Sequence, residues 1–236
     1  MALVYLIPSQ LSEDGFQSIH PYTIDAIKKC QVLFTENERT TRRFLKQLWK
    51  HVLPGENIVI DDFTWHTMDD SAASLHAFRQ YLRENKTIGI VSEAGCPGVA
   101  DPGQALVAIA QELDVPVKPL VGPNSILLSL MASGLNGQQF RFMGYLPIDH
   151  AQRLKAIKDL EAESARKNCT QVFIETPYRN NQLVETLLKN CNPDTRLCIA
   201  VNITSDKESI KTKTIDAWKK SPPDIHKIPA IFLLLA

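Results

Sequence analysis

The chain has 236 residues, of which 44% are hydrophobic and 22% are charged, a composition typical of one large soluble domain or two small ones. Its 26 basic residues balance its 26 acidic residues, which excludes a global positive field but leaves room for a local basic patch. No stretch approaches the ~18 uninterrupted apolar residues of a membrane helix, and no basic leader precedes the first apolar run. We therefore expect a cytoplasmic protein with no membrane contact.

The first half of the chain alternates short apolar runs with helical patterns. The periodicity predicts strands at Leu3–Ile7, Val32–Phe34, Asn57–Ile60, Thr87–Val91 and Val115–Pro119. It predicts helices at Pro21–Lys29, Arg39–Lys50, Ala72–Glu84 and Gln104–Glu112. This alternation indicates β-α-β units and a mainly parallel sheet.

The predicted helix at 39–50 has two faces. Apolar residues recur at helical spacing and form a stripe for burial: Phe44, Leu45, Leu48 and Trp49. Basic residues gather beside it: Arg39, Arg42, Arg43 and Lys46. This basic face is either a solvated surface or a place where RNA phosphates bind.

The segment "VSEAGCPGVADPG", residues 91–103, directly follows the predicted strand Thr87–Val91. Open α/β sheets bind ligands at the carboxyl ends of their strands. Glycines allow a ligand to approach the backbone closely, and prolines limit flexibility: here Gly95, Gly98, Gly103, Pro97 and Pro102. The segment is therefore a candidate ligand loop. The alternative is an ordered turn in which Asp101 caps a helix that begins near Pro102.

The pattern changes after Pro119. A Gly-Pro turn and a polar cap precede an apolar helix that stops at Gly134. Further strands are predicted at Phe140–Met143, Val172–Glu175, Leu197–Ile203, Ile210–Thr214 and Ile228–Leu235, and helices at Asp149–Arg166 and Arg179–Lys189. A hairpin is expected around "TSDKES". We place a domain boundary near residues 117–121, which gives two domains, 1–118 and 119–236.

Familiar catalytic and metal motifs do not occur in the sequence. The five cysteines are odd in number and widely spaced, which predicts neither a disulfide framework nor a zinc site. The sequence has no G-x-G-x-x-G, P-loop, G-x-S-x-G or H-E-x-x-H motif. Two single residues keep open interpretations. Cys96 is a nucleophile or a compact filler in the loop, and His66 is a functional or a surface histidine.

Seven segments occur together in the order and spacing of a known family: "LVYLIPSQLSED", "FTENERTTRRFL", "IVSEAGCPGVADPG", "LVGPNSILLSLMASGL", "FRFMGYLP", "VFIETPYRNNQLVETLL" and "IPAIFLLLA". The chain thereby resembles the tetrapyrrole (corrin/porphyrin) methylase superfamily. It is most similar to the ribosomal RNA small subunit methyltransferase I branch, which methylates a cytidine ribose 2′-oxygen. The resemblance implies an α/β, two-domain tetrapyrrole-methylase-like fold with a mainly parallel sheet in the N-terminal domain and a mixed sheet in the C-terminal domain.

The same resemblance implies a homodimer, and S-adenosylmethionine bound in a cleft that the C-terminal domain completes. It assigns the cofactor to Pro8, Ser92, Glu93, Ala94, Gly95, Cys96, Pro97, Asn124, Ser125, Ile126, Thr176, Pro177, Asn202 and Ala230. Simpler alternatives remain for some of these residues. Asn124 and Ser125 can merely cap their helix, and Ala230 can belong to the core.

Three departures from the family pattern bear on the methyl acceptor. Glu93 stands where the family usually has Asp, Cys96 stands where it has Thr, and "AVNITSDKES" replaces an Arg-Glu-Leu-Thr-Lys pattern. Three functions therefore stay open. They are methylation of RNA in the small ribosomal subunit, methylation of a tetrapyrrole-like small molecule, and ligand binding by a non-catalytic paralogue.

Methylation of a neutral ribose hydroxyl requires a proton acceptor or a strongly orienting hydrogen bond. Glu36 is our candidate because it follows the second predicted strand at the carboxyl edge of the sheet, and Arg39 is placed to hold a substrate phosphate. The alternative is that they are a helix-start acid and a surface base. The reaction needs no metal and no second cofactor.

Overall fold

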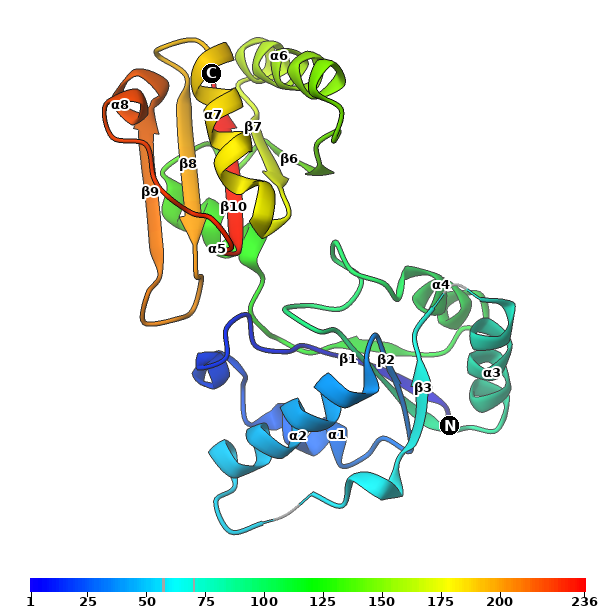
Figure 1. The fold of residues 1–236 in the computed structure, drawn as a ribbon. Helices are drawn as coiled ribbons and strands as arrows, with labels where there is room; N and C mark the ends of the chain where they lie inside the picture. Colours follow the sequence, from blue (N-terminus) through cyan, green and yellow to red (C-terminus); the bar gives the residue numbers. More distant parts are fainter. Residues whose placement is uncertain (57, 70) are drawn as a thin grey trace. The chain divides into compact units, whose positions relative to one another are not determined.

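A computed structural model describes residues 1–56, 58–69 and 71–236 of the chain (Figure 1). The chain divides into two compact units, Met1–Asn124 and Ser125–Ala236. We call them the first and the second unit and describe each by itself.

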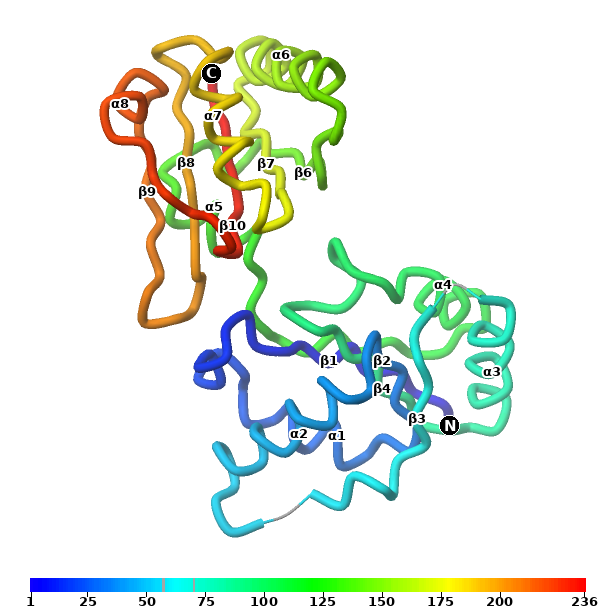
Figure 2. The backbone as a smooth tube through the Cα atoms, in the orientation of Figure 1, coloured from blue at the N-terminus to red at the C-terminus, as the bar shows by residue number. Residues whose placement is uncertain are grey.

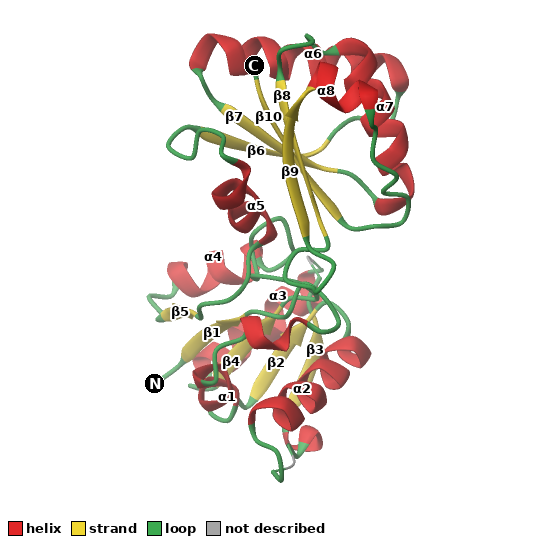
Figure 3. Cartoon of the chain, turned by 90° about the vertical axis from the view of Figure 1, so that its left-hand side faces the viewer, coloured by secondary structure: helices red, strands yellow, loops and turns green. Residues whose placement is uncertain are grey.

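The first unit is built on a parallel sheet with the strand order β3-β2-β4-β1-β5. Figure 3 shows these strands side by side. Every pairing in it is parallel. The strands are β1 (Leu3–Ile7), β2 (Val32–Thr35), β3 (Thr64–Thr67), β4 (Thr87–Val91) and β5 (Val117–Pro119). The central strands are continuous apolar runs because helices cover both faces of a parallel sheet. Accordingly, all four residues of β2 are buried.

Helices cover both faces of this sheet. One face packs against α1 (Tyr22–Ile27) and α2 (Glu38–Val52), and side chains such as Leu33 and Leu45 belong to the same hydrophobic core. The other face packs against α3 (Ala72–Arg83) and α4 (Gln104–Glu112). The backbone trace in Figure 2 follows each crossover from strand to helix and back. This arrangement confirms the predicted β-α-β units.

One predicted strand of this unit is wrong. Of the stretch at 57–60, Asn57 lies outside the described residues, and Ile60 opens a 3-10 turn, Ile60–Asp62. The edge strand is β3 instead. Ile58 packs into the core beside α2, and the Ile60 carbonyl accepts a hydrogen bond from Trp65 Nε1 at 3.1 Å. The apolar run therefore serves core packing, while the β-branched and aromatic residues of β3 pair with β2.

The second unit contains a mixed sheet with the strand order β6-β7-β10-β8-β9. Its strands are β6 (Phe140–Tyr145), β7 (Thr170–Ile174), β8 (Arg196–Val201), β9 (Ser209–Thr214) and β10 (Ala230–Leu235). The β6–β7 pairing is parallel, and the pairings of β7 with β10, β10 with β8 and β8 with β9 are antiparallel. The β8–β9 hairpin confirms the turn predicted around "TSDKES".

Helices α6 (His150–Lys167), α7 (Asn180–Asn190) and α8 (Ile215–Lys220) share one core with this sheet, centred on residues such as Phe173 and Phe232. Helix α5 (Ser125–Ser133) contacts β9 and β10, and Thr212 donates from Oγ1 to the Ser133 carbonyl at 2.6 Å. Figure 3 shows α5 apart from the other three helices. The predicted pairing of a parallel and a mixed sheet is confirmed. Helix α8 was not predicted, because six residues are too short for a helical period to show.

Candidate cofactor and acceptor site

The candidate ligand loop, residues 92–103, leaves the carboxyl end of β4 and leads into α4 (Figure 2). Gly95, Gly98 and Gly103 have positive φ values of 78°, 76° and 112°, a region that favours glycine. Gly103 is also the N-cap residue of α4, and no side chain caps that helix. The alternative in which Asp101 caps this helix is therefore wrong. A left-handed glycine turns the chain into the helix instead.

The loop is fixed to the end of β1 by Ser9. Ser9 and Gly95 form an isolated antiparallel bridge, with N–H to carbonyl distances of 2.9 and 3.0 Å. The Ser9 hydroxyl donates to the Ser92 carbonyl at 2.6 Å, and the Ser92 hydroxyl donates to the Gly95 carbonyl at 2.7 Å. Both serines are buried. These hydrogen bonds join only uncharged groups, and together they hold residues 92–95 in one conformation.

Ser9 was missed by the sequence reasoning. Pro8, its neighbour, was named through the family resemblance, but a single serine after a strand has no pattern of its own. The sequence did offer one signal for Ser9, which is its position directly after a strand. Ser9 follows β1, which pairs with β4 in parallel, so both chain ends leave the same edge of the sheet.

A third segment, residues 122–124, completes this part of the site. A Cβ atom at Gly122 would lie 2.2 Å from Cβ of Pro8, so these two residues are in tight contact. The Cys96 thiol points at the same segment, with Sγ 3.4 Å from the Pro123 carbonyl oxygen. Burial raises the pKa of Cys96, which opposes thiolate formation. The structure thus favours the filler interpretation of Cys96 over the nucleophile.

Three acids lie in or beside the loop. Glu36 follows β2, and its Oε1 accepts the backbone N–H of Glu93 at 3.0 Å. The Glu93 carboxylate accepts the hydroxyl of Thr40, on α2, at 2.8 Å. Burial and, to a smaller extent, the charges of Glu36 and Glu93 together raise the pKa of Asp101 to about 6. Loop 92–103 is therefore held by α2 as well as by β1.

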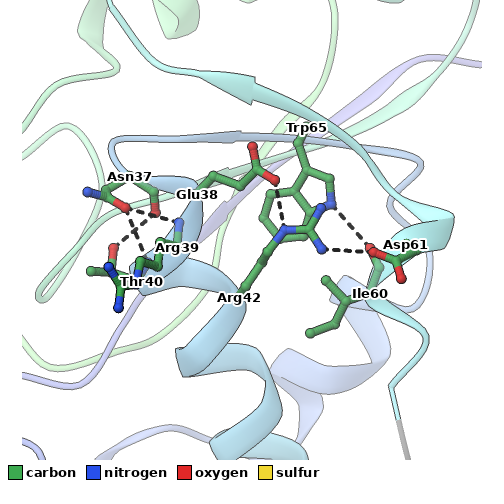
Figure 4. Close-up of polar contacts among 8 residues, drawn as sticks. All are labelled: Asn37, Glu38, Arg39, Thr40, Arg42, Ile60, Asp61 and Trp65. Atoms are coloured by element: carbon green, nitrogen blue, oxygen red, sulfur yellow. Dashed lines mark hydrogen bonds and ion pairs between the residues drawn. The ribbon is translucent and has the colours of Figure 1, made fainter.

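The predicted basic face of α2 does not behave as one surface. Arg42 donates to Glu38 at 2.7 Å and to Asp61 at 2.9 Å, and its guanidinium lies 4.6 Å from the ring centre of Trp65 (Figure 4). Arg39, Arg43 and Lys46 are exposed, and none forms an ion pair within the described part of the chain. Arg39 lies in the first turn of α2, where the Asn37 side chain accepts its backbone N–H. Arg42 thus stabilises the fold. The charged groups of Arg39, Arg43 and Lys46 form no such ion pairs among the described residues.

A cavity of about 370 Å³ lies between these elements of the first unit. It is lined by the segment after β1, by one side of α2 and by the start of the ligand loop. Its lining residues are Ser9, Gln10, Glu13, Thr40, Thr41, Arg43, Phe44, Gln47, Ser92 and Glu93. The cavity therefore adjoins two of the predicted cofactor residues, Ser92 and Glu93.

The candidate residues of the second unit gather at one end of its sheet. Lys227 donates its backbone N–H to the Pro177 carbonyl at 3.0 Å, and Asn202 donates to the Pro229 carbonyl at 3.4 Å. Asn202 has a positive φ of 50°, and Ala230 is a buried residue that pairs with Val201 in the β-ladder. The structure therefore brings Thr176, Pro177 and Asn202 to neighbouring loops, next to Ala230 at the start of β10.

A buried carboxylate braces the 176–177 loop. The Glu175 side chain is fully buried, and its Oε1 accepts the Thr176 N–H at 2.7 Å and two N–H groups of Arg179 at 3.0 and 2.6 Å. These bonds hold both ends of the loop. Ser125 and Ile126, the remaining predicted residues, open α5, and Ile126 is buried. That the residues of both units bind one cofactor stays a prediction.

The described residues contain no cluster of three or more His, Cys, Asp or Glu side chains that could hold a metal ion. His66 is partly buried, stacks on Phe34, and its Nε2 lies 3.0 Å from the Tyr81 hydroxyl. It belongs to the packing of the first unit. Within 1–56, 58–69 and 71–236, no helix combines the length and the apolar character needed to cross a bilayer.

The parallel sheet, the mixed sheet and the glycine loop at a carboxyl edge define an α/β protein with a candidate ligand site at that edge. Residues 21–218 match the family described as Tetrapyrrole (Corrin/Porphyrin) Methylases. The chain belongs to this family.

Curated relatives support this assignment. A ribosomal RNA small subunit methyltransferase I of Micromonospora olivasterospora is 31% identical over 205 residues, which cover 87% of this chain and 60% of the relative. The proteins of the same name from Halalkalibacterium halodurans and Bacillus subtilis are 36% and 27% identical, over 78% and 91% of this chain and 59% and 68% of their own lengths. This chain thus matches about two thirds or less of each relative's length.

Solved structures share the fold. A diphthine synthase superimposes with a TM-score of 0.67 at 16% identity, covering 100% of this chain and 90% of that one. The methyltransferase CobJ superimposes with a TM-score of 0.61 at 17% identity, covering 99% and 93%. At these identities the likeness shows the fold alone.

Proposed function

We propose that the protein is an S-adenosylmethionine-dependent methyltransferase that acts on a ribose 2′-oxygen of small-subunit ribosomal RNA. The observation that carries the proposal is the loop 92–97, which is held in one conformation by Ser9, after β1, and by Glu36, after β2. Membership of the methylase family and the names of the relatives support the donor and the acceptor.

The loop fits a cofactor that is bound largely by backbone groups. At Gly95, a Cβ atom would lie 3.2 Å from a Leu11 methyl group and 3.3 Å from the Pro123 carbonyl, so a larger residue would crowd both flanking segments. Pro8, Ser92–Pro97 and Asn124 would form the wall of the site in the first unit. Ser125, Ile126, Thr176, Pro177, Asn202 and Ala230 would contribute from the second unit. When bound, S-adenosylmethionine supplies an electrophilic methyl group.

Glu36 is suited to receive the proton of the attacking hydroxyl. One of its carboxylate oxygens accepts the Glu93 N–H, which fixes the side chain beside the loop and leaves the second oxygen for a substrate. Holding the hydroxyl in line with the methyl group supplies much of the acceleration. The exposed cations of α2, which include Arg39, would hold the phosphates on either side of the reacting ribose.

The proposal includes a cytoplasmic homodimer. Exposed apolar side chains on the second unit are compatible with it, because a symmetric interface would cover them. They include Leu127, Met131, Tyr145, Ile148 and Tyr178. Light scattering at micromolar concentration should give twice the chain mass of 26.5 kDa, and a monomer would contradict this part of the proposal.

Gly95→Val tests the cofactor site. The variant places a branched side chain at φ 78°, between Leu11 and Pro123, so its affinity for S-adenosylmethionine should fall at least about tenfold. Titration calorimetry measures this affinity, with S-adenosylhomocysteine as a second ligand. Gly137→Val is the matched control, because no atom lies within 4 Å of its added Cβ.

Labelled methyl transfer to undermethylated small ribosomal subunits tests the acceptor. Label in the ribosomal RNA supports the proposal. Label that appears only in a metabolite extract would assign a small-molecule acceptor, and label in neither would favour a non-catalytic paralogue. Absence of S-adenosylmethionine binding at millimolar concentration would refute the methyltransferase itself.

A further inference from the structure

We propose that the second unit has a ligand site of its own, a cavity of about 710 Å³ beside α7 that binds a short apolar peptide with free termini. One wall of the cavity belongs to α7, and the other belongs to the end of α8 and the segment that follows it. Its volume lies in the range of small-ligand sites, about 300–1,000 Å³. None of the residues named for the cofactor or the methyl acceptor lines this cavity, so the inference is independent of the proposed function.

The wall on α7 is a single stripe along the helix. Its residues recur at the three- and four-residue spacing of one helix face: Asn181, Val184, Glu185, Leu188 and Lys189. Val184 and Leu188 belong to the hydrophobic core of the unit and give the stripe an apolar middle. From 181 to 189 the helix rises about 12 Å. The cavity is therefore long enough for three extended peptide residues, which span about 10 Å.

The opposite wall is the segment after α8, which runs alongside α7 in Figure 1. Pro222 and Pro223 restrict the backbone of this wall and have no N–H group. Ile225 then fixes the segment to the helix, because its backbone N–H is donated to Asn181 Oδ1 at 2.9 Å. A stiff wall loses little conformational freedom when a ligand binds to it.

A carboxylate stands at the end of the cavity where α7 begins. Asp224 Oδ1 accepts the side-chain N–H of Asn181 at 2.8 Å and the backbone N–H of His226 at 3.3 Å. These bonds lower the pKa of Asp224, so the group is ionised at neutral pH. Both bonds end on Oδ1, and Oδ2 forms no hydrogen bond with a described residue. This oxygen can accept from an ammonium group.

A cation stands at the end of the cavity where α7 stops. Burial raises the pKa of Cys191, the residue after α7, and the positive charge of Lys219 opposes that rise, so Lys219 lies near this end of the helix. Lys219 is exposed and forms no ion pair with any described residue. Lys189, on the other wall, is held by Glu185 at 2.5 Å. Lys219 is therefore the lysine on this wall that can bind an anionic group.

The ligand class follows from the order of these groups along the cavity. A matching ligand carries an ammonium group, an apolar body and a carboxylate, with about 10 Å between its charged ends. An apolar tripeptide with free termini has these three parts in this order. Its ammonium group would bind Asp224 and its carboxylate would bind Lys219. Its side chains would lie against Leu188 and the two prolines.

The cavity wall is joined to the loop 176–177. The segment continues from Asp224 to Ile228, whose carbonyl accepts Asn180 Nδ2 at 2.6 Å. Within it, Lys227 donates its backbone N–H to the Pro177 carbonyl at 3.0 Å. A peptide that binds Asp224 would restrain this segment, so the hydrogen bond from Lys227 to Pro177 should open less often. Occupancy of the cavity is thereby coupled to the loop.

The experiment titrates the full ¹⁵N-labelled chain with the tripeptide Leu-Ala-Leu and follows amide shifts by NMR. We expect saturable shifts at residues 181–189 and 219–224, with a dissociation constant below about 1 mM. Acetylation of the amino end, or amidation of the carboxyl end, should each weaken binding about threefold, the scale of an exposed ion pair. At saturation, hydrogen exchange of the Lys227 amide should slow about fivefold.

Two variants and a matched control assign the charged ends. Lys219→Gln should remove the effect of amidation, and Asp224→Asn should remove the effect of acetylation. Lys220→Gln is the control. Lys220 neighbours Lys219 but does not line the cavity, and it pairs with Asp216 at 2.8 Å, so its replacement should leave peptide affinity unchanged. A thermal melt of each variant confirms that it folds.

Three results would overturn the inference. Absence of saturable shifts at 10 mM tripeptide, or shifts confined to other residues, would remove the site. Equal affinity for the free and the capped tripeptides would refute the ligand class, because the charged ends would then contribute nothing. Unchanged hydrogen exchange of Lys227 at saturation would refute the coupling to the loop. Since these measurements involve no S-adenosylmethionine, they leave the proposed function to its own tests.

Discussion

The two candidate cofactor loops are held by different interactions. In the first unit, the loop after β4 is fixed by the positive φ values of its glycines, by a backbone bridge to Ser9 and by hydrogen bonds from two uncharged serine hydroxyls. In the second unit, the loop after β7 depends on one buried carboxylate, Glu175, which accepts three N–H groups. Many small interactions make the first loop tolerant of single changes. The second loop concentrates its support in one side chain, so a single substitution should have a large effect there.

The largest expected effect is on the second loop. Glu175→Ala removes a buried partner of Arg179 and should lower the free energy of unfolding of the second unit by about 3 kcal/mol. Urea titration followed by Trp218 emission measures it, since Trp218 lies in the core of that unit. Glu185→Ala is the control. It breaks an exposed pair with the same i,i+4 spacing, to Lys189, and should cost at most about 0.5 kcal/mol. If both variants lost the same free energy of unfolding, the buried carboxylate of Glu175 would stabilise the unit no more than an exposed ion pair does.

The first loop should respond more weakly to Ser9→Ala. The change deletes the hydroxyl bond to Ser92 but keeps the backbone bridge to Gly95, so it should cost about 1 kcal/mol of stability. Affinity for S-adenosylmethionine should fall about fivefold by calorimetry, because the loop becomes less ordered. Ser18→Ala removes a similar hydroxyl bond, to Gly15, away from the loop. It should lower stability and leave cofactor affinity unchanged; a matching loss of affinity in both variants would contradict the bracing role of Ser9.

The smallest expected effect is a pH dependence in the first unit. The pKa of Asp101 is about 6 in the folded protein and 3.8 for the free group, so the folded state binds this proton more tightly. Asp101 therefore destabilises the fold above pH 6, and the penalty disappears as the pH falls to 4. Because the Asp101 carboxyl group is only half-buried, we expect this penalty to lower the free energy of unfolding by about 1 kcal/mol. Asp101→Asn should raise the melting temperature at pH 7.5 and have little effect at pH 4. A gain of the same size at both pH values would contradict the cause assigned here.

Much of the fold could be predicted because burial leaves a clear pattern in the sequence. The strands β2 and β4 are apolar except for one threonine each, and α2 has a regular apolar stripe. Strand β3 was missed because its four residues are only partly buried and polar on average, so the neighbouring apolar run gave the stronger signal. Periodicity reports which residues are buried, and it cannot tell core packing from strand pairing in so short a run.

The candidate site was predictable to a smaller extent. The glycine loop was found because its composition is unusual, and Glu36 was found from its place after a strand. The contacts that hold the loop join distant residues, such as Thr40 with Glu93, or Ser9 with Ser92. The same is true of Arg42 and Asp61, a pairing that removes one cation from the predicted basic face. Such partners depend on the tertiary fold and leave no local pattern.

The cysteines give the protein an internal reporter of ligand occupancy. Burial raises the pKa of Cys30 and of Cys191 to about 12, so these thiols resist alkylation at ordinary pH. Cys96 is only half-buried, although its pKa is also raised, and it lies within the ligand loop. Its slow alkylation at pH 9 can therefore be followed peptide by peptide. Because Sγ points at the segment 122–124, any ligand that closes this segment over the loop will change the rate at which Cys96 reacts.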